Sequence, residues 1–323
     1  MSKLPIWFRR TSPFLDPVAT QRYQLVKQSL GAIPSVPTAP QSAPRRLATV
    51  CEEAKCPNIS ECWSGGTATV MLLGEVCTRG CRFCAVKTGR EGLPVNDFEG
   101  QQLVEAIRQW AERGDNALEI TEPQTSAKLN YLVLTTVARD DLPDLGSTHI
   151  AQAVSEVKAA YPGLLVEALV SDFQGVSEHA KRVACVVDVF AHNIETVERL
   201  QRSVRDKRAG YLQSLKVLET AAQYSVTKSS IMLGLGETDD EIKQSFADLL
   251  NAGVCILTLG QYLQPSKYHM KVKEFITPEQ FAQWKSLGES MGFARVVSGP
   301  LVRSSYRAAD LADLVKGLQL KIK

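Results

Sequence analysis

The sequence predicts an α/β fold in which six strand–helix units curve into a partial barrel. Six apolar runs of strand length are separated by stretches whose apolar residues recur at i, i+4 and i+7, the spacing of a helix face packed on a sheet. Repeated strand–helix units joined by short loops require right-handed crossovers and a parallel sheet. The predicted strands are residues 67–73, 131–137, 164–170, 186–190, 227–233 and 254–259.

Ahead of the barrel we expect an N-terminal segment, residues 1–46, that is basic and partly extended. It contains seven Lys and Arg residues and one Asp, a net charge of +6, which leaves about −4 for the rest of a chain whose total is +2. Four prolines in residues 31–46 argue against regular structure there. The segment is either a solvated extension or an arm for an acidic or nucleic-acid partner. No run of 18 apolar residues and no secretory leader is evident, so no membrane span is expected.

Residues 47–66 form a cysteine-rich loop, and residues 67–300 form the barrel. Helix faces are marked by apolar residues beginning at Leu103, Ile150 and Ile242. Capping boxes predict that two helices begin just after Thr238 and Thr277. We expect residues 301–323 to form a C-terminal tail over the open face of the barrel. Residues 114–128 are longer than an ordinary loop between a helix and a strand, and we interpret them as an exposed insertion.

Six of the eight cysteines fall into two triplets. The first is C-x4-C-x5-C at Cys51, Cys56 and Cys62, and the second is C-x3-C-x2-C at Cys77, Cys81 and Cys84. A disulfide framework suits short secreted chains, and structural zinc sites favour paired knuckles with four ligands. Closely spaced thiolates in threes favour iron–sulfur clusters, each with one iron left for another ligand.

Polar residues follow four of the predicted strands, where catalytic groups of such barrels gather. They are residues 135–143, 191–196, 234–237 and 260–265. The pair Asp140 and Asp141 is either a metal ligand set or, more simply, part of a turn before Leu-Pro. His192 is interpreted as a hydrogen-bonded loop histidine. Cys185 and Cys255 lie near the starts of apolar strands and are expected to be small buried residues.

The second triplet, with Phe83 before its last cysteine, resembles the C-x3-C-x-aromatic-C signature of the radical S-adenosylmethionine (SAM) enzymes. The resemblance implies a [4Fe-4S] cluster on Cys77, Cys81 and Cys84, whose open iron binds SAM and whose electron cleaves it to a 5′-deoxyadenosyl radical. It also implies a partial barrel.

The first triplet, within V-C-E-E-A-K-C-P-N-I-S-E-C-W, and the R-S-S-Y-R sequence of residues 303–307 resemble the lipoyl synthases. The resemblance covers about residues 45–310. It implies insertion of two sulfur atoms at C6 and C8 of a protein-bound octanoyl-lysine, with two SAM molecules consumed per product. It further implies a second [4Fe-4S] cluster, the sulfur donor, on Cys51, Cys56 and Cys62. Its remaining iron would be bound by Ser305, with Ser304 as the alternative.

By the same resemblance, further residues would contact cofactor or substrate. SAM contacts would be Phe83, Thr135, Asn193, Gly234, Gly236 and Gln261. Residues on the substrate side or in the tail would be His269, Arg303, Tyr306 and Arg307. This chain has Ala138 where the family usually has Asp. Any role of that family carboxylate is therefore not expected in this chain.

The resemblance implies several partners. They are an octanoylated carrier (the glycine cleavage H protein or a 2-oxoacid dehydrogenase E2 domain), an electron donor such as ferredoxin or flavodoxin, and an iron–sulfur assembly protein. We expect a monomer that binds neither nucleic acid nor membrane and works in a reducing compartment, the cytoplasm or an organelle. Two alternatives stay open: another radical SAM enzyme, such as a biotin-synthase-like or methylthio-transferring one, and a non-enzymatic metal module that binds RNA through its basic arm.

Overall fold

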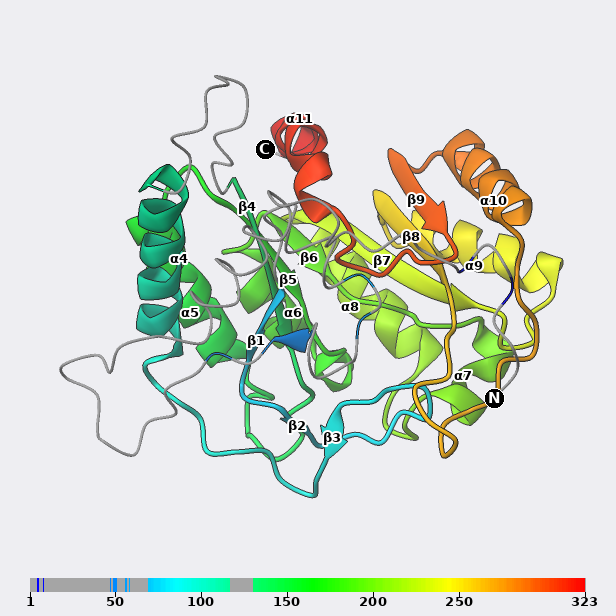
Figure 1. The fold of residues 1–323 in the computed structure, drawn as a ribbon, viewed down its shortest axis with the longest axis horizontal. Coiled ribbons are helices and arrows are strands. Elements are labelled where there is room, and N and C mark those ends of the chain that lie inside the picture. Colours follow the sequence, from blue (N-terminus) through cyan, green and yellow to red (C-terminus); the bar gives the residue numbers. More distant parts are fainter. Residues whose placement is uncertain are drawn as a thin grey trace.

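The computed structural model describes residues 69–116 and 130–322, together with Pro5, Phe8, Leu47, Thr49, Val50, Cys56 and Asn58. The centre of this part is a seven-stranded sheet in the order β1-β4-β5-β6-β7-β8-β9, and every neighbouring pair is parallel (Figure 1). Its strands are β1 (Thr69–Leu72), β4 (Tyr131–Thr136), β5 (Leu165–Leu169), β6 (Val189–Ala191), β7 (Val226–Leu233), β8 (Ile256–Gln261) and β9 (Arg295–Gly299). A two-stranded ribbon of β2 (Val76–Cys77) and β3 (Lys87–Thr88) follows β1.

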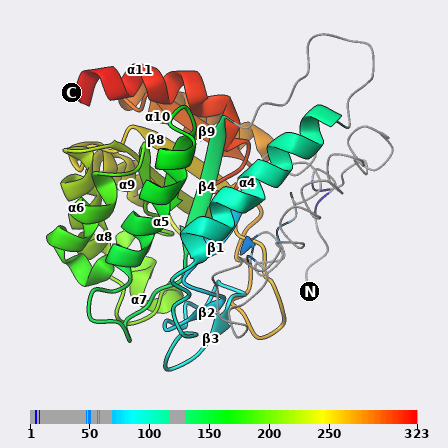
Figure 2. The ribbon, with the colours of Figure 1, turned by 90° about the vertical axis from the view of Figure 1, so that its left-hand side faces the viewer.

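Helices connect successive strands and cover the outer face of the sheet (Figures 1 and 2). The α-helices are α4 (Glu99–Asn116), α5 (Ser147–Ala160), α6 (Ser177–Ala184), α7 (Gln201–Val204), α8 (Tyr211–Ala222), α9 (Asp239–Asn251), α10 (Pro278–Met291) and α11 (Ala312–Ile322). Short 3-10 turns are η3 (Phe173–Gly175), η4 (Glu198–Leu200) and η5 (Ala308–Leu311). No helix in the described ranges has the length and apolar character needed to cross a membrane.

The strand alternation separates two apolar layers. Along β4, Leu132 and Leu134 belong to the core beneath helices α4 to α6, whereas Tyr131 and Val133 belong to a separate core inside the sheet's curve. Successive side chains of a strand point to opposite faces, so a strand covered on both sides is apolar throughout. This explains why β1, β4 and β8 are largely apolar in sequence.

Helix α11 lies at one end of the curved sheet, and the β2–β3 ribbon lies at the other (Figures 1 and 2). Leu311 and Val315 pack with Tyr131, Val226 and other residues from the starts of strands. The C-terminal segment therefore closes the amino end of the barrel interior and leaves the carboxyl end for a site.

A buried polar group lies in the same interior. Lys228 donates to both carboxylate oxygens of Glu167 at 2.9 Å, and the Tyr131 hydroxyl donates to Glu167 at 2.7 Å. All three side chains are essentially inaccessible. Because each partner satisfies the others, the group joins β4, β5 and β7 without leaving a buried charge uncompensated.

The predicted α/β fold is confirmed, and all six predicted strands are present. The sheet contains a seventh strand, β9, that we did not predict, because Arg295-Val-Val-Ser-Gly has only two apolar residues. Both predicted capping boxes are formed, at Thr238 with Glu241 and at Thr277 with Gln280. The expected insertion is corrected at its start, since residues 114–116 belong to α4. Residues 117–129 lie outside the described residues.

Candidate active site

A cavity of about 530 Å³ lies at the carboxyl ends of the strands. Its wall includes Cys77, Cys81 and Cys84 of the second triplet and Cys56 of the first. Val302, Arg303, Ser304 and Ser305 from the C-terminal tail line it as well. Three segments that are far apart in the sequence, and that carry the predicted cluster ligands, thus meet in one space.

The second triplet lies on the loop that begins at the end of β2. All three thiols are free and partly buried, and burial raises the pKa of Cys81 to about 11 and that of Cys84 to about 12. The backbone N–H of Arg79 donates to the Cys77 sulfur at 3.4 Å, and that of Asp206 donates to the Cys81 sulfur at 3.3 Å. Buried thiolates need bound cations and N–H donors, so this set fits an iron–sulfur cluster.

No group of three His, Cys, Asp or Glu side chains in the described ranges converges on a point that one metal ion would occupy. A four-iron cluster makes a different demand, because each thiolate binds a separate iron. The cysteines that line this cavity fit a four-iron cluster rather than a single metal ion.

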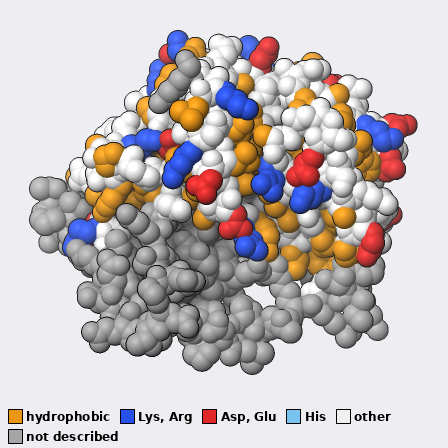
Figure 3. Space-filling view, turned by 90° about the horizontal axis from the view of Figure 1, so that it is seen from above, with side chains coloured by type: hydrophobic (Ala, Val, Ile, Leu, Met, Phe, Trp, Pro, Cys, Tyr) orange, Lys and Arg blue, Asp and Glu red, His pale blue; other side chains and the backbone are white. Residues whose placement is uncertain are grey.

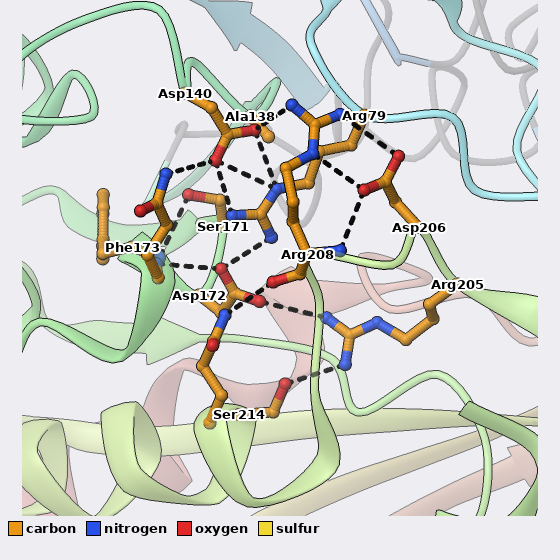
Figure 4. Close-up of polar contacts among 12 residues, drawn as sticks. Arg79, Ala138, Asp140, Ser171, Asp172, Phe173, Arg205, Asp206, Arg208 and Ser214 are labelled. Carbon is orange, nitrogen blue, oxygen red and sulfur yellow. Dashed lines mark hydrogen bonds and ion pairs between the residues drawn. The ribbon is translucent and has the colours of Figure 1, made fainter. Parts of the chain in front are cut away.

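Arg79, inside the C-x3-C segment, anchors the loop to the sheet (Figure 4). Its guanidinium pairs with Asp140 after β4 at 2.8 Å and with Asp172 after β5 at 2.6 Å. Burial opposes the charge of Asp140, but hydrogen bonds from Arg79, Gln174 and Thr78 outweigh it and hold the Asp140 pKa well below its usual range. The carboxylate therefore stays ionised and the loop stays fixed to two strand ends.

The loop is held by backbone contacts too. The Thr78 hydroxyl donates to Ala138 O at 2.9 Å, and Gly80 N donates to Asp206 at 2.9 Å. Arg208 donates to Thr78 O at 2.5 Å. Ala138 thus contributes its backbone carbonyl to the position of the loop.

A chain of contacts continues from Asp172 to His192. Arg205 lies 3.8 Å from Asp172 and donates to the Ser214 hydroxyl at 2.8 Å (Figure 4). His192 bonds to Ser214 at 2.9 Å through Nε2 and to Val170 O at 2.9 Å through Nδ1. Burial, with the positive charge of Arg205, lowers the His192 pKa. A neutral ring donates through Nδ1 and accepts at Nε2, which confirms a hydrogen-bonded structural histidine.

The first cysteine loop approaches the C-terminal tail. Asn58 Nδ2 donates to Leu301 O at 2.6 Å, a contact across 243 residues. A side chain at Gly260 would meet Val302 O at 2.1 Å, so only glycine lets the tail pass this close to β8. Cys56 lines the cavity with Ser304 and Ser305. Cys51 and Cys62 lie outside the described residues.

Four of the six predicted SAM contacts line the cavity: Phe83, Thr135, Asn193 and Gln261. Asn193 Nδ2 donates to Glu195 at 3.2 Å. The Asn193 Oδ1 and Thr136 Oγ1 atoms are buried without a hydrogen-bond partner in the described structure. Buried polar atoms are normally satisfied, so these two are available to a bound molecule.

Gln261 and the two glycines predicted as SAM contacts serve the protein's own backbone. Gln261 lines the cavity, but its Nε2 donates to three carbonyls, including Glu274 O at 2.9 Å, and its Oε1 accepts from Ile276 N at 2.8 Å. Gly234 has φ of 94° and Gly236 has φ of 102°. A Cβ on Gly234 would lie 2.2 Å from Gln261 Nε2. Neither glycine lines the cavity, so close packing within the protein accounts for Gly234.

The residues expected on the substrate side diverge in position. Arg303 lines the cavity. His269 instead donates through Nε2 to Cys84 O at 2.9 Å, and its Nδ1 is hydrogen-bonded to the Ser266 hydroxyl at 2.8 Å. Tyr306 closes a turn through its N–H to Arg303 O at 2.9 Å. Arg307 is exposed and pairs with Asp310 at 2.8 Å. His269 thus stabilises the loop of the second cysteine triplet through its backbone.

One expected core residue is corrected. Cys185 is exposed, because α6 runs to Ala184, Cys185 caps it, and β6 begins only at Val189. Cys255 is partly buried against the interior core beside β8, close to its expected place.

Sequence reasoning missed the buried ions Arg79, Asp172 and Arg205. A signal for Asp172 was present, since it follows the predicted strand 164–170 by two residues, the position that produced the other site predictions. Arg79 was visible between two cysteines, but nothing in the sequence indicates which carboxylates it meets.

Comparison with known proteins gives the same family by two routes, a family model and relatives that match almost the whole chain. A family model for the radical SAM superfamily matches residues 71–249. The chloroplastic lipoyl synthase of Ricinus communis is 52% identical over 318 residues, 96% of this chain and 78% of that one. The chloroplastic lipoyl synthase of Arabidopsis thaliana is 49% identical, with 96% and 72% covered. The mitochondrial lipoyl synthase of Drosophila grimshawi is 48% identical, with 95% and 78% covered.

Among solved structures, Streptococcus suis SuiB bound to S-adenosylmethionine superposes with a TM-score of 0.48 at 8% identity. The superposition covers 72% of this chain and 50% of that one.

Proposed function

The chain belongs to the lipoyl synthases of the radical SAM superfamily, and from this membership we propose that it inserts two sulfur atoms, at C6 and C8, into an octanoyl chain carried on a protein lysine. The enzyme class follows from the family; the atoms attacked and the source of the sulfur are our proposal. The alternatives of a different radical SAM enzyme and of an RNA-binding module lose their support, because the relatives match almost the whole chain.

The observation that carries the proposal is that residues of both predicted ligand sets line one cavity. Cys77, Cys81 and Cys84 supply one set, and Cys56 with the serine pair lies in the same wall. An enzyme that only generated a radical would have no need of the second set. A sulfur donor beside the radical site does require it.

The family implies a [4Fe-4S] cluster and SAM, and we propose that a second cluster is bound as well. The second triplet would hold the first cluster, and Cys51, Cys56, Cys62 and Ser305 would hold the second. When bound, these groups supply a carbon-centred radical and the sulfur atoms. Phe83, Thr135 and Asn193 would contact SAM. Gly234, Gly236 and Gln261 would act on the SAM site only indirectly, by supporting the surrounding backbone. We further propose that residues 301–323 act as a tail whose first part covers the second cluster.

The protein's own contribution is position and exclusion of water. Carbons 6 and 8 of an octanoyl chain carry no acidic proton, so a general base cannot begin the reaction. The cavity wall between the two ligand sets is largely apolar, with Met71, Val137, Leu169 and Val170 among its residues. Such a wall suits an aliphatic chain and keeps water from a reactive carbon.

A lipoyl-carrier protein is the substrate that the family implies. We propose the H protein or an E2 domain as that carrier, ferredoxin or flavodoxin as the electron donor, and an iron–sulfur assembly protein as a further partner. The expected cytoplasmic location is not confirmed. The relatives named above are chloroplastic or mitochondrial, so we propose an organelle as the first compartment to test.

The proposal is tested by removing one ligand set. In the Cys77→Ala, Cys81→Ala, Cys84→Ala variant, reconstituted anaerobically, we expect iron to fall by about half and SAM cleavage to stop, because the other triplet is untouched. Cys255→Ala serves as the control and should keep both. Cleavage that persists in the triple variant would show that the radical site lies elsewhere.

A further inference from the structure

Three segments at the carboxyl end of the barrel lie side by side next to the cavity. They are residues 81–90, 202–208 and 266–273. Arg82 joins them: its N–H donates to Val204 O at 2.9 Å, its Nη1 donates to Ser203 O at 3.2 Å, and its carbonyl accepts from Met270 N at 3.3 Å. The three segments therefore form one continuous surface.

The same segments supply part of the cavity wall. Phe83 and Cys84 line the cavity from the first, Arg205 from the second, and Pro265 adjoins the third. Phe83, Val204 and Met270 also pack within one apolar cluster. The exposed residues of these segments consequently lie close along the chain to residues of the cavity wall.

These segments are almost free of acidic residues. Residues 81–90 and 266–273 contain no Asp or Glu, and residues 202–208 contain only Asp206. Asp206 is already paired with Arg208 at 2.9 Å. We define the basic rim by the exposed side chains of Arg82, Lys207, Lys267 and Lys271. Among the described residues, no carboxylate forms an ion pair with any of these four side chains.

The opposite end of the molecule differs. Seen from the side of α11, acidic and basic side chains are interspersed (Figure 3). Mixed charges are the ordinary state of a solvated surface. A single sign concentrated beside a cavity instead attracts a partner of opposite sign.

An exposed aromatic residue lies within the rim. Tyr268 is 85% exposed, and Lys267 Nζ lies 5.1 Å from the centre of its ring. Tyrosine is enriched in the cores of protein interfaces and charged rims surround such cores. The basic rim thus combines an exposed aromatic side chain, which can be buried in an interface, with a positive electrostatic potential.

We propose that the basic rim with Tyr268 is the docking surface for an acidic face of the carrier protein. This inference rests on the proposed function, because the octanoyl chain and its lysine form a short tether. For that chain to enter the cavity, the body of the carrier must touch the surface around the opening. Opposite charges there speed the encounter and orient the lysine.

The test reverses three charges of the rim that have no part in ligand binding. In Lys207→Glu, Lys267→Glu, Lys271→Glu we expect the Kd and KM for an octanoylated, acidic H protein to rise by about tenfold or more. Turnover of a short octanoyl-lysine peptide should stay unchanged. The control carries the same change in net charge elsewhere: Lys216→Glu on α8 with Lys316→Glu and Lys321→Glu on α11.

Salt gives a second readout. Raising ionic strength from about 0.05 M to about 0.3 M should weaken carrier binding by the wild type and by the control, but should not weaken it for the rim variant, whose reversed charges repel an acidic carrier. Equal Kd values for rim variant and control would overturn the docking surface even if sulfur insertion proceeds. A raised Kd with no sulfur insertion by the wild type would instead defeat the proposed function. An RNA oligonucleotide that binds the rim more tightly than the carrier does would reassign the surface to nucleic acid and overturn the proposal.

Discussion

Ser304 and Ser305 are the residues on which the account of the second cluster depends. Both line the cavity with Cys56, and the contact of Asn58 with Leu301 holds their segment beside the first cysteine loop. A hydroxyl oxygen is a harder and less natural iron ligand than a thiolate. It is therefore suited to an iron that must later release its ligand.

We predict that Ser305→Ala assembles a cluster on three cysteines and still cleaves SAM, but loses most sulfur insertion. The measurement is iron content, cleavage and product from one anaerobic preparation. Ser304→Ala is the matched control, because it removes the neighbouring hydroxyl from the same wall. Normal insertion by Ser305→Ala with loss in Ser304→Ala would reverse the assignment, and full activity in both would remove the tail from the ligand set.

Arg79 supplies a second prediction at this scale. Arg79→Met removes the nearest cation of the buried carboxylates of Asp140 and Asp172, so the free energy of unfolding should fall by about 3–5 kcal/mol. Denaturant unfolding measures this. Arg108→Met, which breaks the exposed pair with Glu105, should change stability very little. If both variants unfold alike, Arg79 does not hold the loop.

Individual residues were predictable where covalent spacing determines their role. The cysteine triplets and Phe83 could be identified from a local pattern, and five of these residues were found in the cavity wall. Asp172 and Arg205 were not predicted, since their pairing depends on strands and a helix brought together by folding. Cys185 was misplaced because an apolar run does not reveal where a helix stops and a strand starts.

At the scale of elements, the C-terminal segment contributes to both ends of the barrel. Its first residues line the cavity, and η5 and α11 pack against the strand starts at the other end. The packing of η5 and α11 against the strand starts therefore also helps to fix the position of Ser304 and Ser305, which precede them in the same segment.

We predict that Leu311→Ala lowers the free energy of unfolding by about 2–3 kcal/mol, because it leaves a cavity against buried strand residues. Leu320→Ala, on the exposed side of α11 at 80% exposure, should cost less than about 0.5 kcal/mol. Thermal or urea unfolding distinguishes them. Similar losses in both variants would mean that α11 does not close the barrel.

Elements with their own local signals were predicted well. The capping boxes at Thr238 and Thr277 determine helix starts by hydrogen bonds within four residues, so the sequence alone reveals them. Strand β9 was missed because its place is set by pairing with β8, from Ile256↔Arg295 to Gly260↔Gly299, rather than by its own composition. The closing role of α11 depends likewise on a distant surface.

At the scale of the whole molecule, the parallel sheet determines where chemistry can occur. The loops after β2, β4, β5 and β6 converge at one end, while α11 occupies the other. The first cysteine loop and the tail reach the same end from opposite ends of the chain. Residues of both proposed ligand sets line one largely apolar space, as a radical at carbon and a nearby sulfur donor would require.

The most direct test of this account follows the sulfur. The protein is reconstituted with iron and sulfide labelled with a heavy sulfur isotope, desalted, and allowed a single turnover with SAM, reductant and an octanoyl-lysine peptide in unlabelled buffer. We predict a lipoyl peptide in which mass spectrometry finds both sulfur atoms labelled, and none formed by the variant lacking Cys51, Cys56 and Cys62. Unlabelled sulfur in the product, or normal product from that variant, would contradict the claim that the second cysteine set supplies the sulfur.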